Sequence, residues 1–446
     1  MKQIAKQFAV ALTLVFSALA LCACGLFDAN VVDDRYPYDV AVEQGYGGSE
    51  GQWLASQDTG TLYHKLYEEA RLEGYTNGYL QFLKDLGVGQ NEAYLQSSLN
   101  SVVKIVSAFS GTSAGEAGSG VIVWLDKAEG EAYVATNYHV VYNARGHASD
   151  IYVWLYGGTG EASAMTATYV CGALNYDVAL LHIAPEDVVV EQSTSAAVNR
   201  HTNADILKDS SAEAATFADF DSITVGEQVY AVGNADNKGI TVTGGIVSVD
   251  FEEITMYGAD DKTEVTLLEI RTDAAINHGN SGGAMFNAQG ELIGIVDARS
   301  EKEGVVGFGY AIPLNRAFAA LKNAYENLAK RNGAVYCAKL GITYSTEGSR
   351  AVYDEETGKT YIEEKIVVKS VDMLTAASTA GLDTGDTIVA ATLNGKKVYL
   401  TRAYKIGDVL LGVREGDTLQ LTVSRGGVTR ELSVTFNMSA WFTQYN

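Results

Sequence analysis

The sequence is short of basic residues. Its 446 residues include 32 lysines and arginines against 55 aspartates and glutamates, which gives a formal net charge of −23 at pH 7. A chain of this sign is repelled by phosphate backbones and by anionic lipid surfaces. We therefore expect no nucleic-acid partner and no membrane binding through surface charge.

Cysteines are also scarce. Only four occur, and no pair of them has the spacing of a metal-binding motif. Cys22 and Cys24 lie near the N-terminus, whereas Cys171 and Cys337 fall in regions that the rest of the pattern assigns to different domains. We expect these last two to be unpaired thiols, and we predict neither a metal nor a cofactor.

The apolar run at the N-terminus is too short for a stable transmembrane helix. Residues 8–21 would span about 21 Å, whereas a hydrocarbon core is ~30 Å thick. Two lysines precede the run and Leu-Cys-Ala-Cys ends it, which is typical of an export signal. This ending resembles the bacterial lipobox, which implies removal of residues 1–23 and a lipid on Cys24. An ordinary signal peptide with incidental cysteines is the alternative.

The middle of the chain lacks the helical crossovers of an α/β fold. Residues 24–60 are polar and glycine-rich and predict a tether, and residues 61–98 have the apolar spacing of a short helical segment. In residues 99–332, short β-rich runs alternate with turn residues, which favours an antiparallel barrel or sandwich. Residues 335–437 form a second compact unit. We therefore predict a mainly β protein.

Glycines gather around one serine. Ser281 lies in Gly-Asn-Ser-Gly-Gly at 279–283, which indicates either a plain surface turn or a nucleophile whose neighbouring N–H groups face an oxyanion. A serine nucleophile also needs a histidine base and an acid that orients it. All six histidines precede Ser281. This excludes the Ser-Asp-His order of α/β-hydrolases and leaves the order His-Asp-Ser.

His139 and Asp177 are the best candidates for the base and the acid. His139 lies in YVATNYHVV, where an apolar strand ends and an imidazole would reach the rim of a sheet. Asp177 begins the apolar strand of YDVALLHI, where a partly buried carboxylate needs a partner. The alternatives are a structural histidine and a turn aspartate. His182 and His278 are further candidates for positions near the site.

These motifs together resemble those of the HtrA (Deg) family of trypsin-fold serine proteases. TNYHVV, YDVALLHI and GNSGG are similar to its three triad motifs, and GSGVIVW and VGFGYAIP are similar to other segments of the same domain. The resemblance implies a chymotrypsin/trypsin-like double β-barrel over residues 99–332. It also implies a serine endopeptidase whose triad is His139, Asp177 and Ser281.

The residues around the triad would then form the oxyanion hole and the pocket for the substrate side chain. An oxyanion hole is expected from Gly279, Asn280 and Ser281. Trypsin-like enzymes that select lysine or arginine carry an acid six residues before the serine, where this chain has alanine. We therefore predict a pocket for small or medium aliphatic side chains, lined by Ala275, Ile276, Val296 and Asp297. The sequence departs from the family pattern at two places in this region. His278 stands where the family commonly has proline, and VGNADNKG at 232–239 lacks the Pro-Phe that usually follows Gly-Asn.

Residues 335–437 resemble a PDZ domain of the HtrA type. Leu340, Gly341 and Ile342 match the carboxylate-binding loop, whose N–H groups hold a peptide C-terminus while the peptide adds as a strand. A long acidic stretch, residues 345–364, is expected to separate this loop from the next strand. The alternative is a module that serves packing alone.

Two functions remain open at this stage. The first is an extracytoplasmic serine endopeptidase, held at the bacterial membrane only by its lipid anchor. It would cleave unfolded or misfolded envelope proteins and bind peptide C-termini at its PDZ domain, and the resemblance implies a homotrimer. The second is a catalytically silent chaperone or peptide-binding protein with the same fold. The intact triad favours the enzyme.

Overall fold

The computed structural model describes residues 91–111, 115–190, 200–219, 223–298, 307–355 and 359–445, together with Ala70. The predictions for residues 1–23, residues 24–60 and Cys24 lie outside these residues, as does most of the helical segment predicted at 61–98. The end of that segment is α6 (Asn91–Ser98). No described helix is long and apolar enough to cross a membrane. The chain divides into two compact units, and the second, Ser98–Asn446, contains everything that follows.

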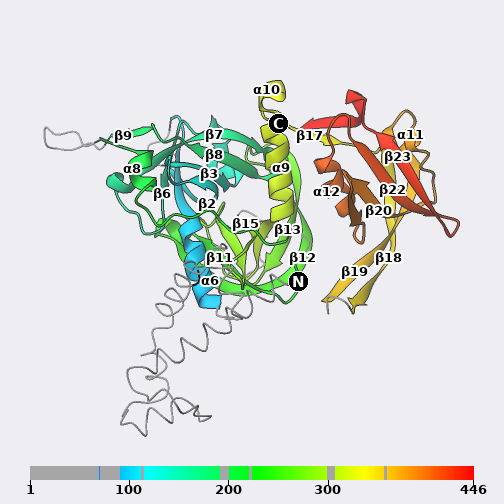
Figure 1. Cartoon of the computed structure of the whole chain (residues 1–446), viewed down its shortest axis with the longest axis horizontal. Helices are drawn as coiled ribbons and strands as arrows, with labels where there is room; N and C mark the ends of the chain where they lie inside the picture. The colour runs from blue at the N-terminus through cyan, green and yellow to red at the C-terminus, as the bar shows by residue number, and fades with distance from the viewer. Residues whose placement is uncertain are drawn as a thin grey trace, which may run out of the picture. The chain divides into compact units, whose positions relative to one another are not determined.

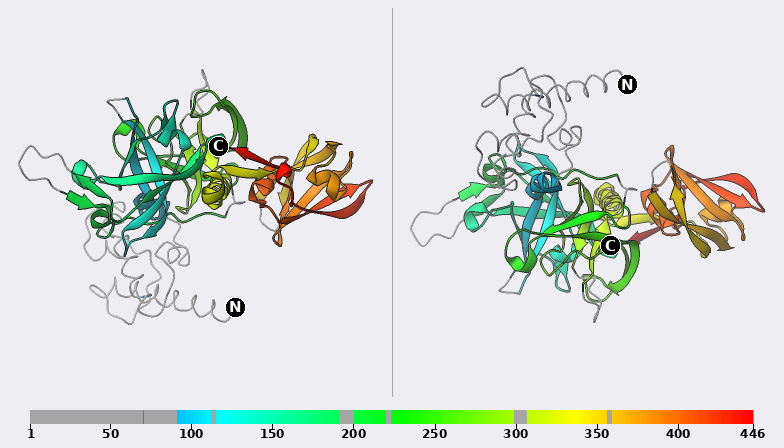
Figure 2. Two further views of the ribbon diagram at one scale, coloured as in Figure 1. Left: turned by 90° about the horizontal axis from the view of Figure 1, so that it is seen from above. Right: turned by 90° about the horizontal axis from the view of Figure 1, so that it is seen from below.

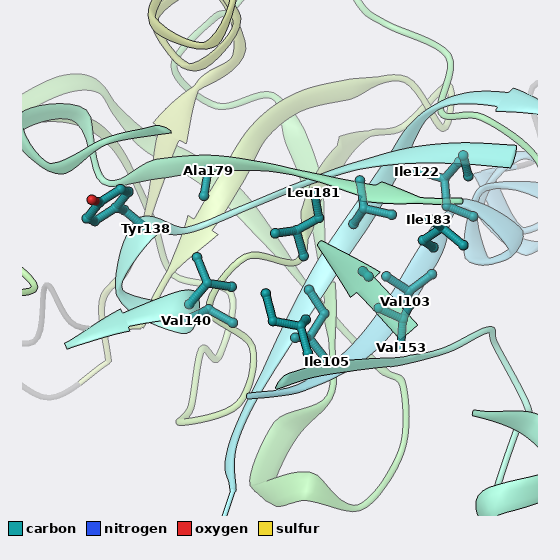
Figure 3. Packing of buried hydrophobic residues seen from close by; sticks show 14 of the residues in the cluster. Val103, Ile105, Ile122, Tyr138, Val140, Val153, Ala179, Leu181 and Ile183 are labelled. Carbon is teal, nitrogen blue, oxygen red and sulfur yellow. The ribbon is translucent and has the colours of Figure 1, made fainter. Parts of the chain in front are cut away.

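Six antiparallel strands close the first barrel in the order β1-β2-β3-β8-β7-β6. They are β1 (Val102–Ala108), β2 (Glu116–Asp126), β3 (Glu131–Thr136), β6 (Asp150–Trp154), β7 (Met165–Ala173) and β8 (Val178–Ile183). Inward side chains such as Ile105, Ile122 and Leu181 are fully buried and meet in its core (Figure 3). Burial of each of these side chains stabilises the folded protein by about 1.5–3 kcal/mol. Tyr138 and Ala179 lie at one end of this cluster (Figure 3), and they are close in the sequence to His139 and Asp177.

A second set of six strands closes another barrel in the order β11-β12-β13-β16-β15-β14. They are β11 (Gln228–Gly233), β12 (Thr241–Tyr257), β13 (Glu264–Thr272), β14 (Ala284–Asn287), β15 (Leu292–Asp297) and β16 (Gly309–Pro313). Every residue of β14 and β15 is buried, so these strands fix the turn that precedes β14 and holds Ser281. The two closed barrels confirm the predicted double-barrel fold (Figure 1).

Short elements connect the strands of the barrels. They are η1 (Leu99–Ser101), α7 (Tyr138–Val141), β4 (Tyr142–Asn143), β5 (Gly146–His147), η2 (Glu161–Ser163), η3 (Leu174–Tyr176), β9 (Val188–Val190), β10 (Arg200–Thr202), α8 (Asn203–Leu207) and η4 (Ala235–Asn237). Cys171, on β7, and Cys337 are both free thiols. Burial raises the pKa of Cys171 to about 12 and that of Cys337 to about 11, so neither is a ready nucleophile.

Two helices follow β16, α9 (Leu314–Glu326) and α10 (Leu328–Arg331). The apolar stripe of α9 packs against β7, β15 and the helix α12 (Lys405–Gly412) of the C-terminal module. Asn323 is fully buried and donates its amide to the carbonyls of Tyr336 and Leu411, each at 3.1 Å. α9 therefore links the barrels to the module that follows.

The C-terminal module is one antiparallel sheet with two helices, drawn in yellow to red in Figure 2. Its strands are β18 (Ile342–Asp354), β19 (Lys359–Val371), β20 (Thr387–Leu393), β21 (Lys396–Tyr399), β22 (Thr418–Arg425) and β23 (Val428–Thr435). The helices are α11 (Ala376–Ala380) and α12, and β17 (Val335–Ala338) pairs with β24 (Phe442–Tyr445) after η5 (Ser439–Trp441).

The acidic stretch at 345–364 differs from its expected form. It does not separate the Leu340 loop from the next strand, because it belongs to the paired strands β18 and β19. The pairing runs from Ile342 opposite Val371 to Asp354 opposite Lys359. Arg350 pairs with Glu363 across the two strands at 2.6 Å. Such cross-strand ion pairs offset part of the negative charge of this stretch.

Candidate active site

His139 and Asp177 meet at the rim of the first barrel. α7 carries His139 directly after β3, and Asp177 lies between η3 and β8. The Nδ1 atom of His139 lies 2.6 Å from Oδ2 of Asp177, and the backbone N–H of His139 donates to Oδ1 at 2.9 Å. An ionised carboxylate can only accept, so the ring nitrogen donates and Nε2 is left as an acceptor. That tautomer is the one a general base needs.

The backbone around this pair is firmly held. Asp177 adopts the left-handed conformation, with φ of 47°, and its carbonyl accepts a hydrogen bond from the buried amide of Asn137 at 3.0 Å. Tyr138 packs among Tyr142, His147 and Tyr169. Burial raises the pKa of Tyr138 to about 12, so the ring stays neutral where it anchors α7. The imidazole and the carboxylate are therefore held in place from two sides.

Ser281 lies in a turn of the second barrel. This turn packs closely against the segment before His139. A methyl group added at Gly282 would come within 2.1 Å of Oγ1 of Thr136. β15 holds the turn, because Gly282 donates to the carbonyl of Val296 and Val296 donates to Gly283, both at 2.9 Å. The Ser281 hydroxyl accepts a hydrogen bond from the N–H of Ala298 at 3.3 Å. The turn that carries Ser281 therefore contacts Thr136 and Asn137, in the segment that leads into His139.

Two N–H groups of this turn are directed away from its internal hydrogen bonds. The His278 carbonyl accepts from Asp236 at 2.8 Å, and the Asn280 carbonyl accepts from Gly283 at 2.9 Å. A planar trans peptide directs its N–H opposite to its carbonyl, so Gly279 and Ser281 direct theirs away from these partners. In the described part of the chain, no group accepts from either of them. Asn280 differs, because its N–H donates to Asn277 at 3.0 Å.

Gly279 is required by its surroundings. Its φ is 93°, and an added Cβ would lie 2.3 Å from the carbonyl oxygen of Asn234. Only glycine combines this backbone conformation with so close an approach. The loop it touches, η4 with its neighbours, lies in the segment that lacks the Pro-Phe of the family pattern, and it nevertheless holds the His278 carbonyl.

Ser119, on β2, connects this turn to both barrels, and the sequence analysis did not identify it. Its buried hydroxyl donates to the Gly279 carbonyl at 2.7 Å and accepts from the N–H of Asn234 at 2.8 Å. Its own N–H donates to the Ser281 carbonyl at 2.8 Å. The one available signal was its setting in Gly-Ser-Gly, which repeats the small-residue pattern around Ser281.

Replacing Ser119 by alanine should lower kcat by about tenfold to a hundredfold. The change leaves a buried carbonyl and a buried N–H without their partner, which costs roughly 1–3 kcal/mol and loosens the peptide units of the turn. KM should change little. Ser107→Ala is the matched control, because Ser107 is equally buried on β1. Equal rates for the two variants in a peptide-hydrolysis assay would refute the expectation.

The residues expected to line the substrate pocket divide into two groups. Ala275 is exposed, and its carbonyl accepts from the hydroxyl of Thr243 at 2.7 Å. Ile276 and Val296 are buried in the core of the second barrel. Asp297 is placed differently from that expectation, because its carboxylate lies next to His139 and Asp177.

The remaining histidines have other surroundings. His182 pairs with Glu131 at 2.7 Å and stacks on Tyr133, and His201 contacts the Ala164 carbonyl. The side chain of His278 is exposed. His147 belongs to the aromatic group around Tyr138, and His64 lies outside the described residues.

The Leu340–Ile342 loop of the C-terminal module resembles the Ser281 turn, because two of its backbone N–H groups are directed away from internal hydrogen bonds. The Leu340 carbonyl accepts from Ala377 at 2.9 Å, and the Gly341 carbonyl accepts from Asp372 at 3.0 Å. The planar peptides therefore direct the N–H groups of Gly341 and Ile342 to the opposite side. Such a pair of N–H groups at the start of an edge strand can hold a carboxylate.

These features define a class of protein, a trypsin-like peptidase followed by a PDZ domain. The family model of the trypsin-like peptidase domain matches residues 118–295, and that of the PDZ domain matches residues 338–436. A Serine protease Do-like HtrA from Lactococcus lactis subsp. cremoris (strain MG1363) is 31% identical over 342 residues, which cover 75% of this chain and 74% of that relative. The chain therefore belongs to the HtrA family of serine proteases.

Two further similarities are with another protease and with a solved structure. The Periplasmic serine endoprotease DegP of Escherichia coli (strain K12) is 33% identical over 282 residues, which cover 63% of this chain and 49% of that relative. A solved structure titled HtrA-type protease AlgW with tripeptide aligns with 80% of this chain and 97% of its own, at 25% identity and a TM-score of 0.47. The trypsin-like peptidase domain and the HtrA relatives identify the enzyme class as serine endopeptidase.

Proposed function

We propose that this serine protease cleaves peptide bonds through His139, Asp177 and Ser281. Ser281 attacks the scissile carbonyl, His139 takes its proton and then delivers it to the leaving amine, and Asp177 stabilises the imidazolium. The supporting observation is the double contact of His139 with Asp177, at 2.6 and 2.9 Å, beside the turn that carries Ser281. Casein digestion by the wild type and by Ser281→Ala tests the proposal.

The oxyanion hole consists of the N–H groups of Gly279 and Ser281. Each donor of such a hole is worth roughly 2.7–4 kcal/mol of transition-state stabilisation. Both N–H groups are oriented by bonds of the neighbouring carbonyls within the protein. This supports catalysis over the silent chaperone, which would need a hole that is not formed. Asn280 contributes through the turn and not as a donor.

The substrates are unfolded or misfolded proteins with small or medium aliphatic residues before the cleaved bond. Ala275, at the position where an acid would select basic residues, supports a non-basic specificity. Unfolded or misfolded substrates are proposed from the similarity to HtrA proteases. Assembly as a homotrimer is proposed from the family resemblance alone.

The PDZ domain binds peptide C-termini at Leu340, Gly341 and Ile342. Two N–H groups of the loop are turned away from its internal bonds, and β18 is an edge strand to which a peptide can add. The carboxylate would accept from these N–H groups, and the peptide backbone would pair with β18.

Gly341→Ala should weaken the binding of a peptide C-terminus by about tenfold or more. Gly341 has φ of 75°, and an added Cβ would lie 2.5 Å from Cβ of Thr375, so the loop must move. Fluorescence anisotropy with a labelled peptide measures the effect. Gly385→Ala is the matched control, because Gly385 has φ of 93° but open space around it. Unchanged affinity in Gly341→Ala would locate the carboxylate site elsewhere.

The protein acts outside the cytoplasm, anchored to the bacterial membrane by a lipid on Cys24. The export signal and lipobox at residues 1–24 support this location. The description of the Escherichia coli relative as periplasmic agrees with it. The lipid is the anchor, because the acidic chain is repelled by anionic headgroups.

Mass spectrometry of protein from the membrane fraction should find Cys24 as a lipid-modified N-terminal residue. Cys24→Ala should then release the protease from that fraction, whereas Cys22→Ala should leave it there. Retention of residues 1–23, or an unmodified Cys24 in membrane-bound protein, would contradict the lipid anchor.

A further inference from the structure

The turn before Asp177 packs against the second barrel. η3 ends at Asp177, whose backbone N–H donates to the carbonyl of Leu174 at 3.2 Å. The Leu174 side chain is buried and belongs to the core cluster of the first barrel. Three buried members of that cluster come instead from the β12–β13 hairpin of the second barrel: Ala259, Val265 and Leu267. Leu174 therefore joins the acid of the proposed triad to the barrel that carries Ser281.

The contact between Leu174 and this hairpin is close. Gly258 directly follows β12, and a Cβ added to it would lie 2.7 Å from Cδ2 and 3.2 Å from Cγ of Leu174. The hairpin is closed at this point, because the N–H of Gly258 donates to the carbonyl of Thr263 at 2.7 Å. The hairpin backbone therefore lies directly against the leucine side chain, which has no room to move toward it.

The backbone of Asp177 needs such support. Its left-handed conformation, with φ of 47°, costs a residue other than glycine roughly 1–2 kcal/mol and persists where the surroundings hold it. The amide of Asn137 holds the Asp177 carbonyl at 3.0 Å. A cavity of about 230 Å³ borders the same turn, and its lining includes Asn175 and Leu267. Loss of the Leu174 side chain would therefore let the turn relax, and the Asp177 carboxylate would shift with it.

We propose that Leu174 is a positioning residue, through which the β12–β13 hairpin holds Asp177 against His139. The inference rests on the proposed triad. The two contacts between Asp177 and His139, at 2.6 and 2.9 Å, are short enough that a small displacement lengthens both. A displacement of about 1 Å can cost about a hundredfold in rate. The second barrel thus positions the acid as well as carrying the nucleophile.

The test compares Leu174→Ala and Leu174→Met with the wild type. We expect kcat to fall at least about tenfold in the alanine variant, with KM little changed because Leu174 is buried in the core. Methionine fills nearly the same volume, so Leu174→Met should keep kcat within about threefold of wild type. An alanine variant with wild-type kcat would overturn the proposal, and so would a methionine variant as impaired as the alanine variant.

Leu207→Ala is the matched control, because it removes the same atoms from the same cluster. Leu207 is fully buried on α8. This helix packs at the far end of β3 from His139, where a Cβ added to Gly130 would lie 2.6 Å from Cα of Ala204. The change should lower the free energy of unfolding and leave kcat within about threefold of wild type. An equal loss of kcat in Leu207→Ala would show that general destabilisation, and not the position of Asp177, causes the effect.

Proton NMR provides a readout that a loss of packing elsewhere would not change. The Nδ1 proton of His139, held by a short hydrogen bond to Asp177, should give a low-field resonance that is absent in His139→Ala. It should move to higher field in Leu174→Ala and stay in place in Leu207→Ala. An unmoved resonance in a Leu174→Ala variant of reduced kcat would overturn the proposal.

Leu267→Ala keeps the proposal testable if Leu174→Ala does not fold. This change removes the packing from the side of the second barrel, and it should lower kcat and move the same resonance. A Leu267→Ala variant with wild-type kcat and an unmoved resonance would overturn the role of the hairpin. Failure of the triad itself would appear separately, as turnover retained by Ser281→Ala.

Discussion

Replacing Ser281 by alanine should lower kcat for peptide hydrolysis by about 10⁶-fold. The hydroxyl is the proposed nucleophile, and losing it leaves only the oxyanion hole and substrate binding to accelerate attack by water. The fold should survive, because the hydroxyl accepts one long hydrogen bond, from Ala298 at 3.3 Å. Hydrolysis of casein and of a fluorogenic peptide measures the loss, and thermal unfolding checks the fold.

Ser107→Ala is the control for this experiment. Ser107 is also buried, but it lies on β1 in the first barrel and its removal should leave turnover near that of the wild type. Turnover of Ser281→Ala above about one per cent of wild type, in protein free of contaminating protease, would be incompatible with a nucleophilic Ser281.

Asp177→Asn should lower kcat by about 10⁴-fold with little change in KM. The backbone N–H of His139 still finds an oxygen, so the geometry remains. The amide, however, cannot accept from Nδ1 as a carboxylate does, and its NH₂ group favours the tautomer whose Nε2 carries the proton. That imidazole cannot take the proton of Ser281. The measurement is the steady-state rate with a peptide substrate.

Asp260→Asn is the matched change for Asp177→Asn. Asp260 accepts backbone N–H groups of its own turn between β12 and β13, and its loss should leave kcat unaltered. A decrease of less than tenfold in Asp177→Asn would mean that another group orients His139, and Asp297 would be the first to examine.

The order of the motifs was sufficient to predict the fold class and to select His139, Asp177 and Ser281 as candidates. The strands around them are apolar runs of the right length, and only one order of base, acid and serine was available. The structure joins His139 to Asp177, and the roles of these residues and of Ser281 stay proposals until the variants are measured.

Ser119 and Asp297 could not be placed in the same way. The hydroxyl of Ser119 joins residues 115 and 160 positions away in the chain, and no local pattern encodes such contacts. Asp297 ends a strand whose six residues are all buried, so alternation does not reveal which way its side chain points. The β18–β19 hairpin was not predicted, because its acidic composition is not typical of strands and its cross-strand pairing is seen only in the structure.

The most direct measurement is the location of a fluorophosphonate adduct by peptide mass spectrometry. The expected result is a single adduct on Ser281 of the folded protein, no adduct in Ser281→Ala, and much slower labelling of Asp177→Asn because its histidine no longer activates the hydroxyl. Ser107→Ala should be labelled at the wild-type rate. An adduct on a different serine, or equal labelling of Ser281→Ala, would contradict the proposed triad.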